Sequence, residues 1–509
     1  MKYAVTGSQM KQIDQDTIQR IGIPSLVLME RAALAVAEAV EKLAAGTGRK
    51  ARILAVCGTG NNGADGIAAG RILWNRGYDV VVLLAGNLDH ATKEHRLQQQ
   101  TAQALGVPVI REGQQVPGRF TIVVDAVFGI GLCREVTGSY RDLLTWLSEM
   151  EDVQVVAVDI PSGIHADTGA ILGTALKADV TVTFGYRKVG HLFYPGRSLA
   201  GQVQVAETGF SDQSLEKTGW AGLVPERKDL GRLPGRRADG NKGTFGRLLV
   251  IAGSRGMSGA AYLCGLAAYR AGAGLVKVLT VEDNRGILQT QLPEAVFAGY
   301  DPEKALEAPD SFREQIAGQL KWADAIVLGP GLGTEPYARL LAETVLSLRQ
   351  VPLVLDADCL NLAAAFPEFT RYFSENVIVT PHMGEMARLC GMSVEALKAD
   401  PLGAARDYSS RTGAICVLKD AVTVTACKDK TAWINPSGSS AMAKGGSGDV
   451  LAGILGAFLA QKASPMDSAV LGVYIHGLAG ERAARKNPGS LLAHEIADAL
   501  TQLEAGQTG

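Results

Sequence analysis

A glycine-rich segment near the C-terminus carries the residue pattern with the clearest chemical meaning. Residues 443–451 read Ala-Lys-Gly-Gly-Ser-Gly-Asp-Val-Leu, and an apolar stretch follows to position 460. Glycines that open a helix leave backbone N–H groups free to bind an anion, and the helix dipole favours negative charge there. An acid in the first turn is repelled by a phosphate, but it can take a proton from the group that attacks the phosphate. We therefore predict that Asp449 is a general base, the alternative being a glycine-rich turn in which Asp449 only begins the helix.

Acids and amides also follow strand-like segments in the first half of the chain. Residues 61–65 (Asn-Asn-Gly-Ala-Asp) follow one such segment, and Asp125 and Asp159 end two others. The carboxyl ends of parallel strands meet at one edge, so these side chains are expected to face a common crevice. Their oxygens suit a hard cation or a polar ligand. The alternative is that each acid only caps a loop or a helix.

Residues 58–63 match the GxGxxG pattern of dinucleotide-binding folds, after a strand and before a helix. Such a fold also needs an acid about 20 residues further on, at the end of the second strand. Asp79 precedes the segment 80–84 instead, and Ala-Gly-Asn follows it. A hydride-transfer enzyme is therefore disfavoured, although it stays an alternative.

Short apolar runs alternate with helix-like stretches in both halves, which predicts an α/β protein with two doubly wound, mostly parallel sheets. Strands are expected at 53–57, 80–84, 122–125, 155–159, 180–184, 248–252, 275–279, 325–328, 353–356, 377–380 and 415–419. Helices are expected at 258–273 and 447–460, and over 8–45 with a break near Gly22-Ile23-Pro24. We expect domains over 1–215 and 241–509, and a linker over 216–240, which is rich in charge, glycine and proline.

The composition limits the compartment and the partners. With 509 residues, 47% apolar and 20% charged, the chain is typical of a soluble protein of two or more domains. A formal net charge of -2 gives no reason to expect nucleic acid or an anionic membrane as partner. The polar N-terminus predicts no signal peptide, and no apolar run reaches the length of a membrane span. Seven scattered cysteines without a CxxC pair suit a reducing cytosol, so we expect a cytoplasmic protein.

Taken together and in order, the motifs of both halves resemble the bifunctional NAD(P)H-hydrate repair enzymes. The segments 61–66, 125–129 and 159–163 resemble the epimerase domain of that family. The segments 242–246, 258–261, 329–333, 380–385 and 443–451 resemble its ADP- or ATP-dependent dehydratase domain, a relative of the ribokinase-like kinases. The resemblance implies two three-layer α/β/α domains, Rossmann-like and then ribokinase-like. Two residues depart from the family pattern: Ala64 replaces a usual glycine and Met383 a common proline.

The resemblance implies a repair reaction on hydrated nicotinamide nucleotides. NADH and NADPH can gain water across a ring double bond, which gives NADHX and NADPHX as two epimers at C6. The first domain would interconvert the R and S epimers with the help of K⁺. The second would dehydrate the S form at the expense of ADP, releasing AMP and phosphate, with Mg²⁺ accompanying the nucleotide. ATP in place of ADP, a preference between NADHX and NADPHX, and a homo-oligomer stay open.

The resemblance also assigns roles to residues. Asp449 would be the base for the C6 hydroxyl, and Asp159 would do the acid–base work of epimerisation. Besides Asp159, the epimerase pocket would be lined by Asn61, Asn62, Gly63, Ala64, Asp65, Gly129, Ile130, Gly131, Leu132, Cys133, Arg134 and Glu135. The second substrate site would comprise Ala261, Gly333, His382 and Asp449. The nucleotide would contact Lys419, Asp420, Ala421, Val422, Thr423, Gly445, Gly446, Ser447 and Gly448. Asn62, Asp125 and Ser162 would hold the potassium ion, since all three offer oxygen.

Two of these residues have simpler interpretations. Lys188 could assist Asp159, but a solvated surface lysine is the expected state. His382 could instead be a turn histidine whose ring is satisfied by the backbone. The main alternative for the function of the whole chain is a ribokinase-like small-molecule kinase fused to a ligand-binding Rossmann-like module. The Gly448-Asp449 arrangement serves either reaction. An assay with vitamin or sugar alcohols would separate the two.

Overall fold

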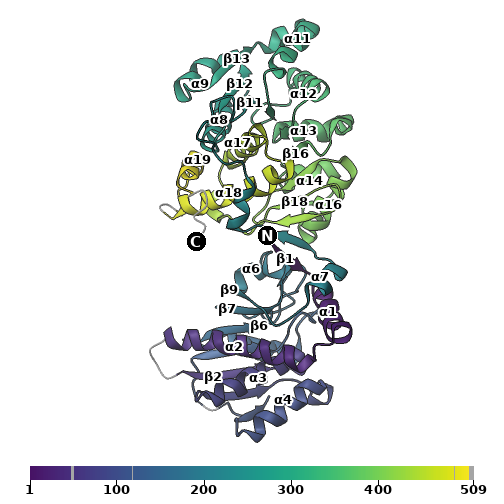
Figure 1. Ribbon diagram of the computed structural model, residues 1–509, viewed down its shortest axis with the longest axis vertical. Coiled ribbons are helices and arrows are strands. Elements are labelled where there is room, and N and C mark those ends of the chain that lie inside the picture. The colour runs from purple at the N-terminus through teal and green to yellow at the C-terminus, as the bar shows by residue number, and fades with distance from the viewer. Residues whose placement is uncertain (47–50, 117, 486–487, 504–509) are drawn as a thin grey trace. The chain divides into compact units, whose positions relative to one another are not determined.

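The computed structural model describes residues 1–46, 51–116, 118–485 and 488–503, which form two compact units. The N-terminal unit comprises Tyr3–Gly222, and the C-terminal unit comprises Leu223–Gly509 with Met1–Lys2. Each unit contains a sheet flanked by helices (Figure 1). The range 216–240, for which the sequence predicts a linker, contains strand β10 (Gly222–Val224) and the 3-10 helix η4 (Arg227–Arg232).

The N-terminal sheet is parallel throughout its described strands, in the order β4-β3-β2-β5-β6-β7-β9. Its strands are β2 (Arg52–Cys57), β3 (Asp79–Leu84), β4 (Val109–Arg111), β5 (Ile122–Ala126), β6 (Gln154–Val158), β7 (Val180–Phe184) and β9 (Gln202–Ala206). The sequence predicts the five central strands but not the edge strands. Strand β4 has only three residues and β9 is partly exposed along its length, so neither shows a continuous apolar run.

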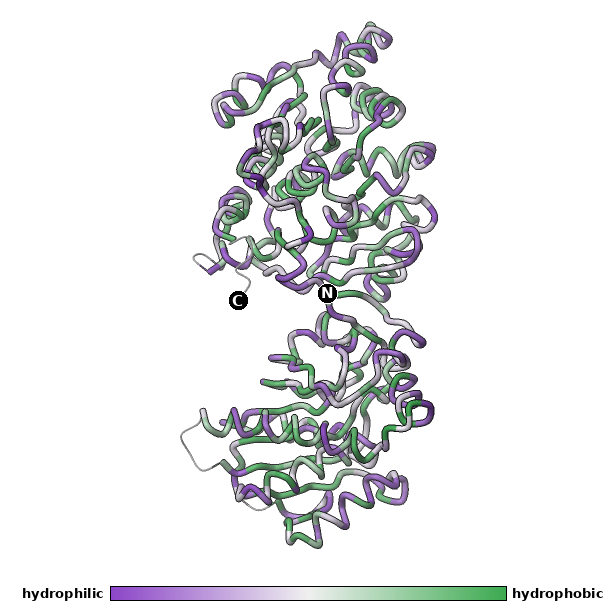
Figure 2. Tube along the Cα trace, viewed as in Figure 1, coloured by the Kyte–Doolittle hydropathy of each residue, from purple (hydrophilic) through white to green (hydrophobic). Residues whose placement is uncertain are grey.

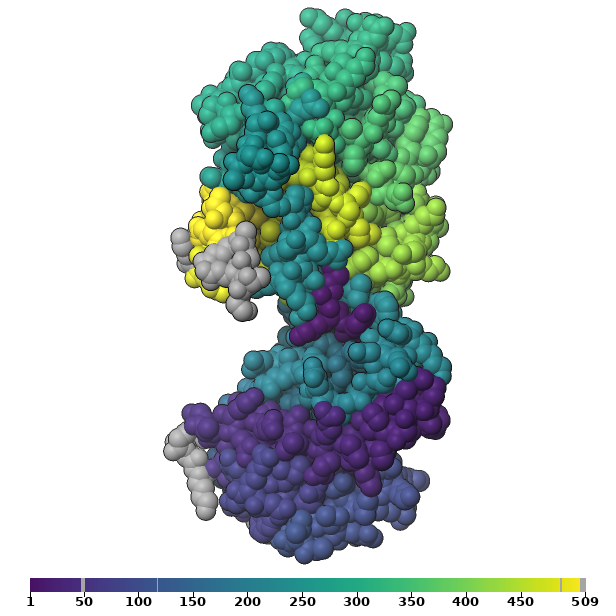
Figure 3. Space-filling view, viewed as in Figure 1, coloured from purple at the N-terminus to yellow at the C-terminus, as the bar shows by residue number. Residues whose placement is uncertain are grey.

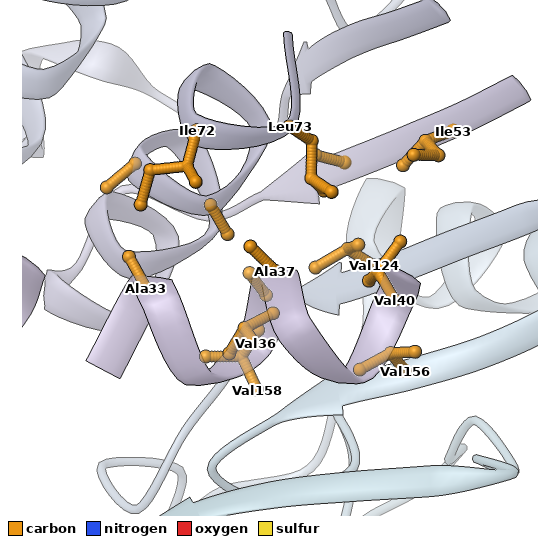
Figure 4. Close-up of a cluster of buried hydrophobic side chains, with 14 of the residues drawn as sticks. Ala33, Val36, Ala37, Val40, Ile53, Ile72, Leu73, Val124, Val156 and Val158 are labelled. Carbon is orange, nitrogen blue, oxygen red and sulfur yellow. The ribbon is translucent and has the colours of Figure 1, made fainter. Parts of the chain in front are cut away.

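Helices cover both faces of this sheet. Alternate residues of β2 point to opposite faces: Ile53 and Ala55 pack with helices α2 (Ser25–Gly46) and α3 (Asn61–Asn75), whereas Leu54 and Val56 pack with α5 (Gly138–Ser148). Figure 4 shows the first of these cores, where Val36 and Val40 of α2 face Val124 and Val156 of the sheet. The unit is therefore the three-layer α/β/α sandwich that the resemblance implies.

The outer helices show the expected polarity. Apolar residues concentrate along the strands of this unit, whereas α4 (Lys93–Ala104) is largely polar (Figure 2). The predicted N-terminal helix is broken, as expected, between α1 (Gly7–Asp16) with the π-turn η1 (Thr17–Ile21) and α2. In the space-filling view these N-terminal helices form a purple band across one side of the unit (Figure 3).

The C-terminal sheet has the order β13-β12-β11-β14-β15-β16-β17-β18-β19, and β10 pairs with β19. Its strands are β11 (Arg247–Ile251), β12 (Leu275–Val281), β13 (Val296–Tyr300), β14 (Ala325–Leu328), β15 (Leu353–Leu355), β16 (Val377–Val379), β17 (Ile415–Leu418), β18 (Val424–Ala426) and β19 (Ala432–Ile434). Pairing is parallel from β13 to β17, antiparallel between β17 and β18 and between β18 and β19, and parallel between β19 and β10. The sequence predicts six of the parallel strands.

Helix α17 (Ser447–Ala460) runs through the centre of the C-terminal unit and is buried on all sides from Val450 onward. It packs with α8 (Ser258–Arg270), and Leu451 and Leu455 join the core beneath the sheet. The sequence predicts the bounds of α17, because its apolar run begins directly after the glycine-rich segment. No helix within the described ranges is long and apolar enough to cross a membrane. The α/β fold class is confirmed.

We predict that Leu73→Ala lowers the free energy of unfolding of the N-terminal unit by about 2–5 kcal/mol. Leu73 is fully buried between α3 and the sheet (Figure 4), so the substitution leaves a cavity. Chemical denaturation of the full chain, followed by hydrogen exchange of peptides from this unit, measures the change. The control is Leu105→Ala, since Leu105 is 44% exposed, and its effect should stay within about 0.5 kcal/mol. Equal effects of the two substitutions would contradict the assigned core.

Candidate active sites

The first site lies where the strand order of the N-terminal sheet reverses. Strands β2 and β5 are neighbours although β3 and β4 come between them in the sequence, and ligands bind beyond the carboxyl ends of such strands. A cavity of about 490 Å³ is found there. Ten of the predicted pocket residues line it: Asn61, Asn62, Asp65, Gly129, Ile130, Gly131, Leu132, Cys133, Arg134 and Asp159.

Of the described residues predicted for this pocket, Gly63, Ala64 and Glu135 do not line the cavity. A Cβ at Gly63 would approach the Gly58 carbonyl oxygen to 1.7 Å, so glycine lets α3 begin close against the end of β2. Ala64 is fully buried in the first turn of α3 and has no positive φ. Alanine therefore fits where the family usually has glycine. Contact of these three residues with substrate stays a prediction.

Asp159 is the charged centre of the cavity. It follows β6 with a positive φ of 68°, a conformation that costs energy in a residue other than glycine and often marks a functional turn. Its Oδ1 accepts hydrogen bonds from Lys188 Nζ at 2.6 Å and from Thr183 Oγ1 at 3.0 Å. Burial opposes the charged form, but the Lys188 ammonium outweighs it and lowers the pKa of Asp159 below its usual value. The side chain is therefore a carboxylate at neutral pH.

The expectation that Lys188 is a solvated surface lysine is wrong. Its side chain is fully buried and lines the cavity, and its Nζ also donates to Thr183 Oγ1 at 2.8 Å and to the Phe184 carbonyl at 3.2 Å. Lys188 lies in the short strand β8 (Arg187–Lys188), where it pairs with Val5 of β1 (Lys2–Val5). The sequence shows no alternation around a two-residue strand, so only the tertiary structure reveals its burial.

A second carboxyl group, Asp65, faces the same cavity. Burial and the negative charges of Asp159 and Asp14 raise the pKa of Asp65 well above its usual value. Asp14 also lines the cavity, and its pKa is raised by burial and by Glu94. The cavity thus combines one carboxyl group whose pKa is lowered with two whose pKa values are raised, an arrangement that suits proton transfer.

The residues predicted to hold potassium come from three elements: Asn62 lies in the first turn of α3 and lines the cavity, Asp125 lies in β5, and Ser162 follows β6. Ser162 Oγ donates to Asp125 Oδ1 at 2.5 Å, and the Ser162 N–H donates to Asp125 Oδ2 at 2.8 Å, with both residues fully buried. The Asn62 amide lies against Gly129, and its Nδ2 has no hydrogen-bond partner within the described chain. The Asp125 carboxylate, the Ser162 hydroxyl and the Asn62 Oδ1 offer the oxygen ligands that a hard monovalent cation needs, whereas the unpaired Nδ2 is an N–H donor and cannot bind one.

The second site surrounds the N-terminus of α17. Gly446 precedes the helix with a φ of 93°, which favours glycine. Ser447 Oγ donates to the Met442 carbonyl at 2.7 Å, which fixes the loop, and Lys444 Nζ lies 3.5 Å from the Gly489 carbonyl. N–H groups in the first turn of a helix have no intrahelical acceptor. This loop is therefore suited to bind an anion beside Asp449.

Next to this turn lies an ion pair that the sequence-based interpretation did not include. Asp356, which follows β15, accepts hydrogen bonds at Oδ1 from Thr380 Oγ1 at 2.6 Å and from Lys419 Nζ at 2.8 Å. Asp358 accepts from the Gly333 N–H at 2.9 Å. The signal was available, because Asp356 ends a predicted strand just as Asp125 and Asp159 do.

The surroundings of Asp449 favour its protonated form. Burial, then the negative charge of Asp356, raises the pKa of Asp449 to about 7, while the Lys419 ammonium opposes the rise. A carboxyl group that titrates near neutral pH is well matched to general base catalysis.

His382 and Ala261 were also predicted to line this site. His382 is the N-cap of α14 (Met383–Cys390), where its Nδ1 accepts from the Gly384 and Glu385 N–H groups at 3.0 and 3.3 Å. These are the contacts of a turn histidine, although a backbone bridge also pairs it with Lys419. Ala261 is fully buried in α8. Residues Asp420, Ala421, Val422 and Thr423 form the turn between β17 and β18.

Comparison with known proteins identifies the family. The family described as NAD(P)H-hydrate dehydratase matches residues 248–502, and the YjeF-related protein N-terminus matches residues 25–190. A bifunctional NAD(P)H-hydrate repair enzyme of Moorella thermoacetica is 35% identical over 98% of this chain and 96% of its own. This chain belongs to the bifunctional NAD(P)H-hydrate repair enzymes.

A second repair enzyme agrees with this assignment, as does the resemblance noted from the motifs. The repair enzyme of Thermofilum pendens is 36% identical over 94% of this chain and 91% of its own. An ADP/ATP-dependent NAD(P)H-hydrate dehydratase from Bacillus subtilis, crystallised with ATP and Mg²⁺, is 31% identical, with a TM-score of 0.48, and covers 55% of this chain and 97% of its own. The recognition of the repair enzyme family from the sequence is confirmed.

We predict that Lys188→Met destabilises the N-terminal unit by about 3–5 kcal/mol at neutral pH, because it leaves the Asp159 carboxylate buried and unpaired. The folded-state pKa of Asp159 is lowered, so the pair stabilises the protein above the usual carboxyl pKa of about 4. The difference between wild type and variant should therefore shrink as the pH falls through the folded-state pKa. Urea denaturation across pH measures it.

Lys217→Met is the matched control, because Lys217 pairs with Asp16 through an exposed ammonium group. It should change the stability little at any pH. A pH-independent loss for Lys188→Met would contradict the assigned ion pair.

Proposed function

We propose that this chain repairs hydrated NADH and NADPH in two steps. The N-terminal unit interconverts the R and S epimers of NADHX and NADPHX. The C-terminal unit converts the S epimer to NAD(P)H at the expense of ADP, giving AMP and phosphate. The observation that carries the proposal is the first turn of α17, where Asp449 with a pKa of about 7 lies beside an anion-binding loop and the Asp356–Lys419 pair.

In the proposed dehydration, Asp449 accepts the proton of the C6 hydroxyl as the hydroxyl oxygen attacks the terminal phosphorus of ADP. The bond between that phosphorus and AMP breaks, and the first turn of α17 stabilises the charge of the transferring group. The C6–O bond then breaks with phosphate as leaving group, and loss of a proton from C5 restores the ring double bond. Hydroxide alone is a poor leaving group, which explains the need for phosphorylation.

Nucleotide and magnesium would enter this site together. Lys419 and the N–H groups of Gly448 and Asp449 fit the phosphates, and the turn 420–423 would contact the rest of the nucleotide. Among the described residues, no group of three or more His, Cys, Asp or Glu side chains could hold a metal ion. Mg²⁺ would therefore be held mainly by the phosphates, as is common for nucleotide sites.

In the proposed epimerisation, the Asp159 carboxylate accepts the proton of the C6 hydroxyl. C6 carries both this hydroxyl and the ring nitrogen, so loss of the hydroxyl proton lets the C6–N1 bond open, and reclosure on the other face inverts the carbon. Lys188 keeps Asp159 ionised for this role. Potassium at Asn62, Asp125 and Ser162 would supply positive charge that holds the start of α3, the end of β5 and the turn after β6 together.

The test incubates the purified protein with mixed epimers, ADP and K⁺, and follows the return of reduced-nicotinamide absorbance. Both epimers should be consumed and AMP should appear in equal amount. Phosphorylation of an added sugar or vitamin alcohol, without recovery of NADH, would instead support a small-molecule kinase.

We predict that Asp449→Asn lowers the rate of dehydration by about 10²–10⁴-fold while epimerisation continues. The amide keeps the shape of the side chain but cannot accept the proton. Recovery of NADH from the S epimer measures dehydration, and chromatography that follows the equilibration of the two epimers measures epimerisation. Asp310→Asn, at a side chain that is 98% exposed, should leave both rates unchanged. A variant that keeps more than about a tenth of the wild-type rate would rule out Asp449 as the base.

We predict that Asp159→Ala leaves the S epimer fully repairable, whereas the R epimer is consumed only as fast as it inverts spontaneously. Replacing K⁺ by tetramethylammonium should give a milder form of the same defect. The exposed acid Asp142 provides the control Asp142→Ala, which should change neither rate. Separate measurement of R and S consumption decides the outcome, because equal slowing of both epimers would show that Asp159 supports the fold or a shared step.

A further inference from the structure

Three side chains that follow consecutive parallel strands form a network beneath the N-terminus of α17. Asp356 follows β15, Thr380 follows β16 and Lys419 follows β17, and Asp356 Oδ1 accepts hydrogen bonds from both of the others. Asp356 and Thr380 are each 1% exposed. Burying a carboxylate so deeply costs free energy unless the group is paired. The charge of Asp356 is therefore expected to have a role in the site.

The network adjoins the first turn of α17 directly. A Cβ on Gly448 would lie 3.3 Å from Lys419 Nζ and 3.6 Å from Asp356 Oδ2. Glycine at this position therefore gives the ion pair room against the backbone of the helix, one residue before Asp449. The Lys419 ammonium lies where an anion at the α17 N-terminus would be within its reach.

The other titratable groups near Asp449 come from three further elements. Asp358 lies in the first turn of α13 (Asp358–Ala365), Cys264 lies on α8 and His476 on α18 (Pro465–Ala484). Burial and the Asp449 charge raise the pKa of Cys264, and burial and the Lys419 charge lower the pKa of His476 to about 4. Both are therefore neutral near pH 7, so the charges that act on Asp449 are those of Asp356, Asp358 and Lys419.

We propose that Asp356 is a positioning residue for dehydration, which holds the Lys419 ammonium beneath the transferring phosphoryl group and whose negative charge makes Asp449 a stronger base. The proposal rests on the proposed function of the C-terminal site. A like charge nearby favours the protonated form of a carboxyl group and so raises its affinity for a proton. Lys419 acts in the opposite direction, and its bond to Asp356 partly neutralises that effect.

The experiment records kcat/KM for the S epimer against pH with the full chain at saturating ADP. Asp449 must be ionised to act, so the rate falls as the pH falls through its pKa. Asp356→Asn removes a negative charge and should move this acid limb to lower pH by about one unit. Lys419→Met removes a positive charge and should move the limb to higher pH by a similar amount. Both should also lower the maximal rate at least about tenfold, because the ammonium is lost or displaced.

Two variants that keep the charges serve as controls. Thr380→Val removes a hydrogen bond to Asp356 without changing any charge, so its acid limb should coincide with that of the wild type. Asp356→Glu keeps the charge but alters its reach, so the limb should stay in place while the maximal rate falls. Thermal unfolding shows whether Asp356→Asn folds. If it does not, the two single variants Asp356→Glu and Lys419→Met test the proposal without it.

The two charge-removing variants must shift the limb in opposite directions. A common direction of shift, or lowered rates without any shift, would overturn the proposal and leave Asp356 a purely structural residue. Failure of the wild-type chain to dehydrate the S epimer with ADP would instead overturn the proposed function of the site. The two failures are therefore distinguishable in one set of measurements.

Discussion

Burial of each sheet on both faces is the constraint on which the rest of the structure depends. In β2, Ile53 and Ala55 pack into one core and Leu54 and Val56 into the other, so the faces of the strand are closed to polar groups. Parallel strands that are buried in this way can place polar side chains only where they end. Because all parallel strands end at the same edge, residues far apart in the sequence gather there, and both candidate sites lie at such an edge.

In both units, a buried carboxylate at the end of a strand is stabilised by the same kinds of hydrogen-bond donor. Oδ1 of Asp159 accepts from Lys188 Nζ and Thr183 Oγ1, and Oδ1 of Asp356 accepts from Lys419 Nζ and Thr380 Oγ1. The ammonium and the hydroxyl together offset the cost of burying the charge. The consequences differ, since the paired Asp159 itself faces the cavity with a lowered pKa, whereas the paired Asp356 raises the proton affinity of its neighbour Asp449.

Much of the fold could be predicted because its signals are local. The apolar runs at 53–57 and 325–328 and the helix at 447–460 coincide with observed elements, since each is a continuous buried segment bounded by turn residues. Strand β9 escaped prediction because it is partly exposed along its length. Strands β4 and β18 have three residues of which one is polar, whereas the equally short β15 and β16 are wholly apolar and were predicted.

For the sites, the sequence by itself determined which residue types stand at the strand ends and, through its ordered motifs, the enzyme family. It could not determine which side chains become partners. Lys188 pairs with Asp159 across 29 residues, and Lys419 with Asp356 across 63, because β7, β8 and β17 bring them there. Those pairings depend on strand order and register, which many distant contacts set together. The tertiary structure alone therefore decided that Lys188 is buried, and that the charges of Asp356 and Lys419 act on the buried Asp449.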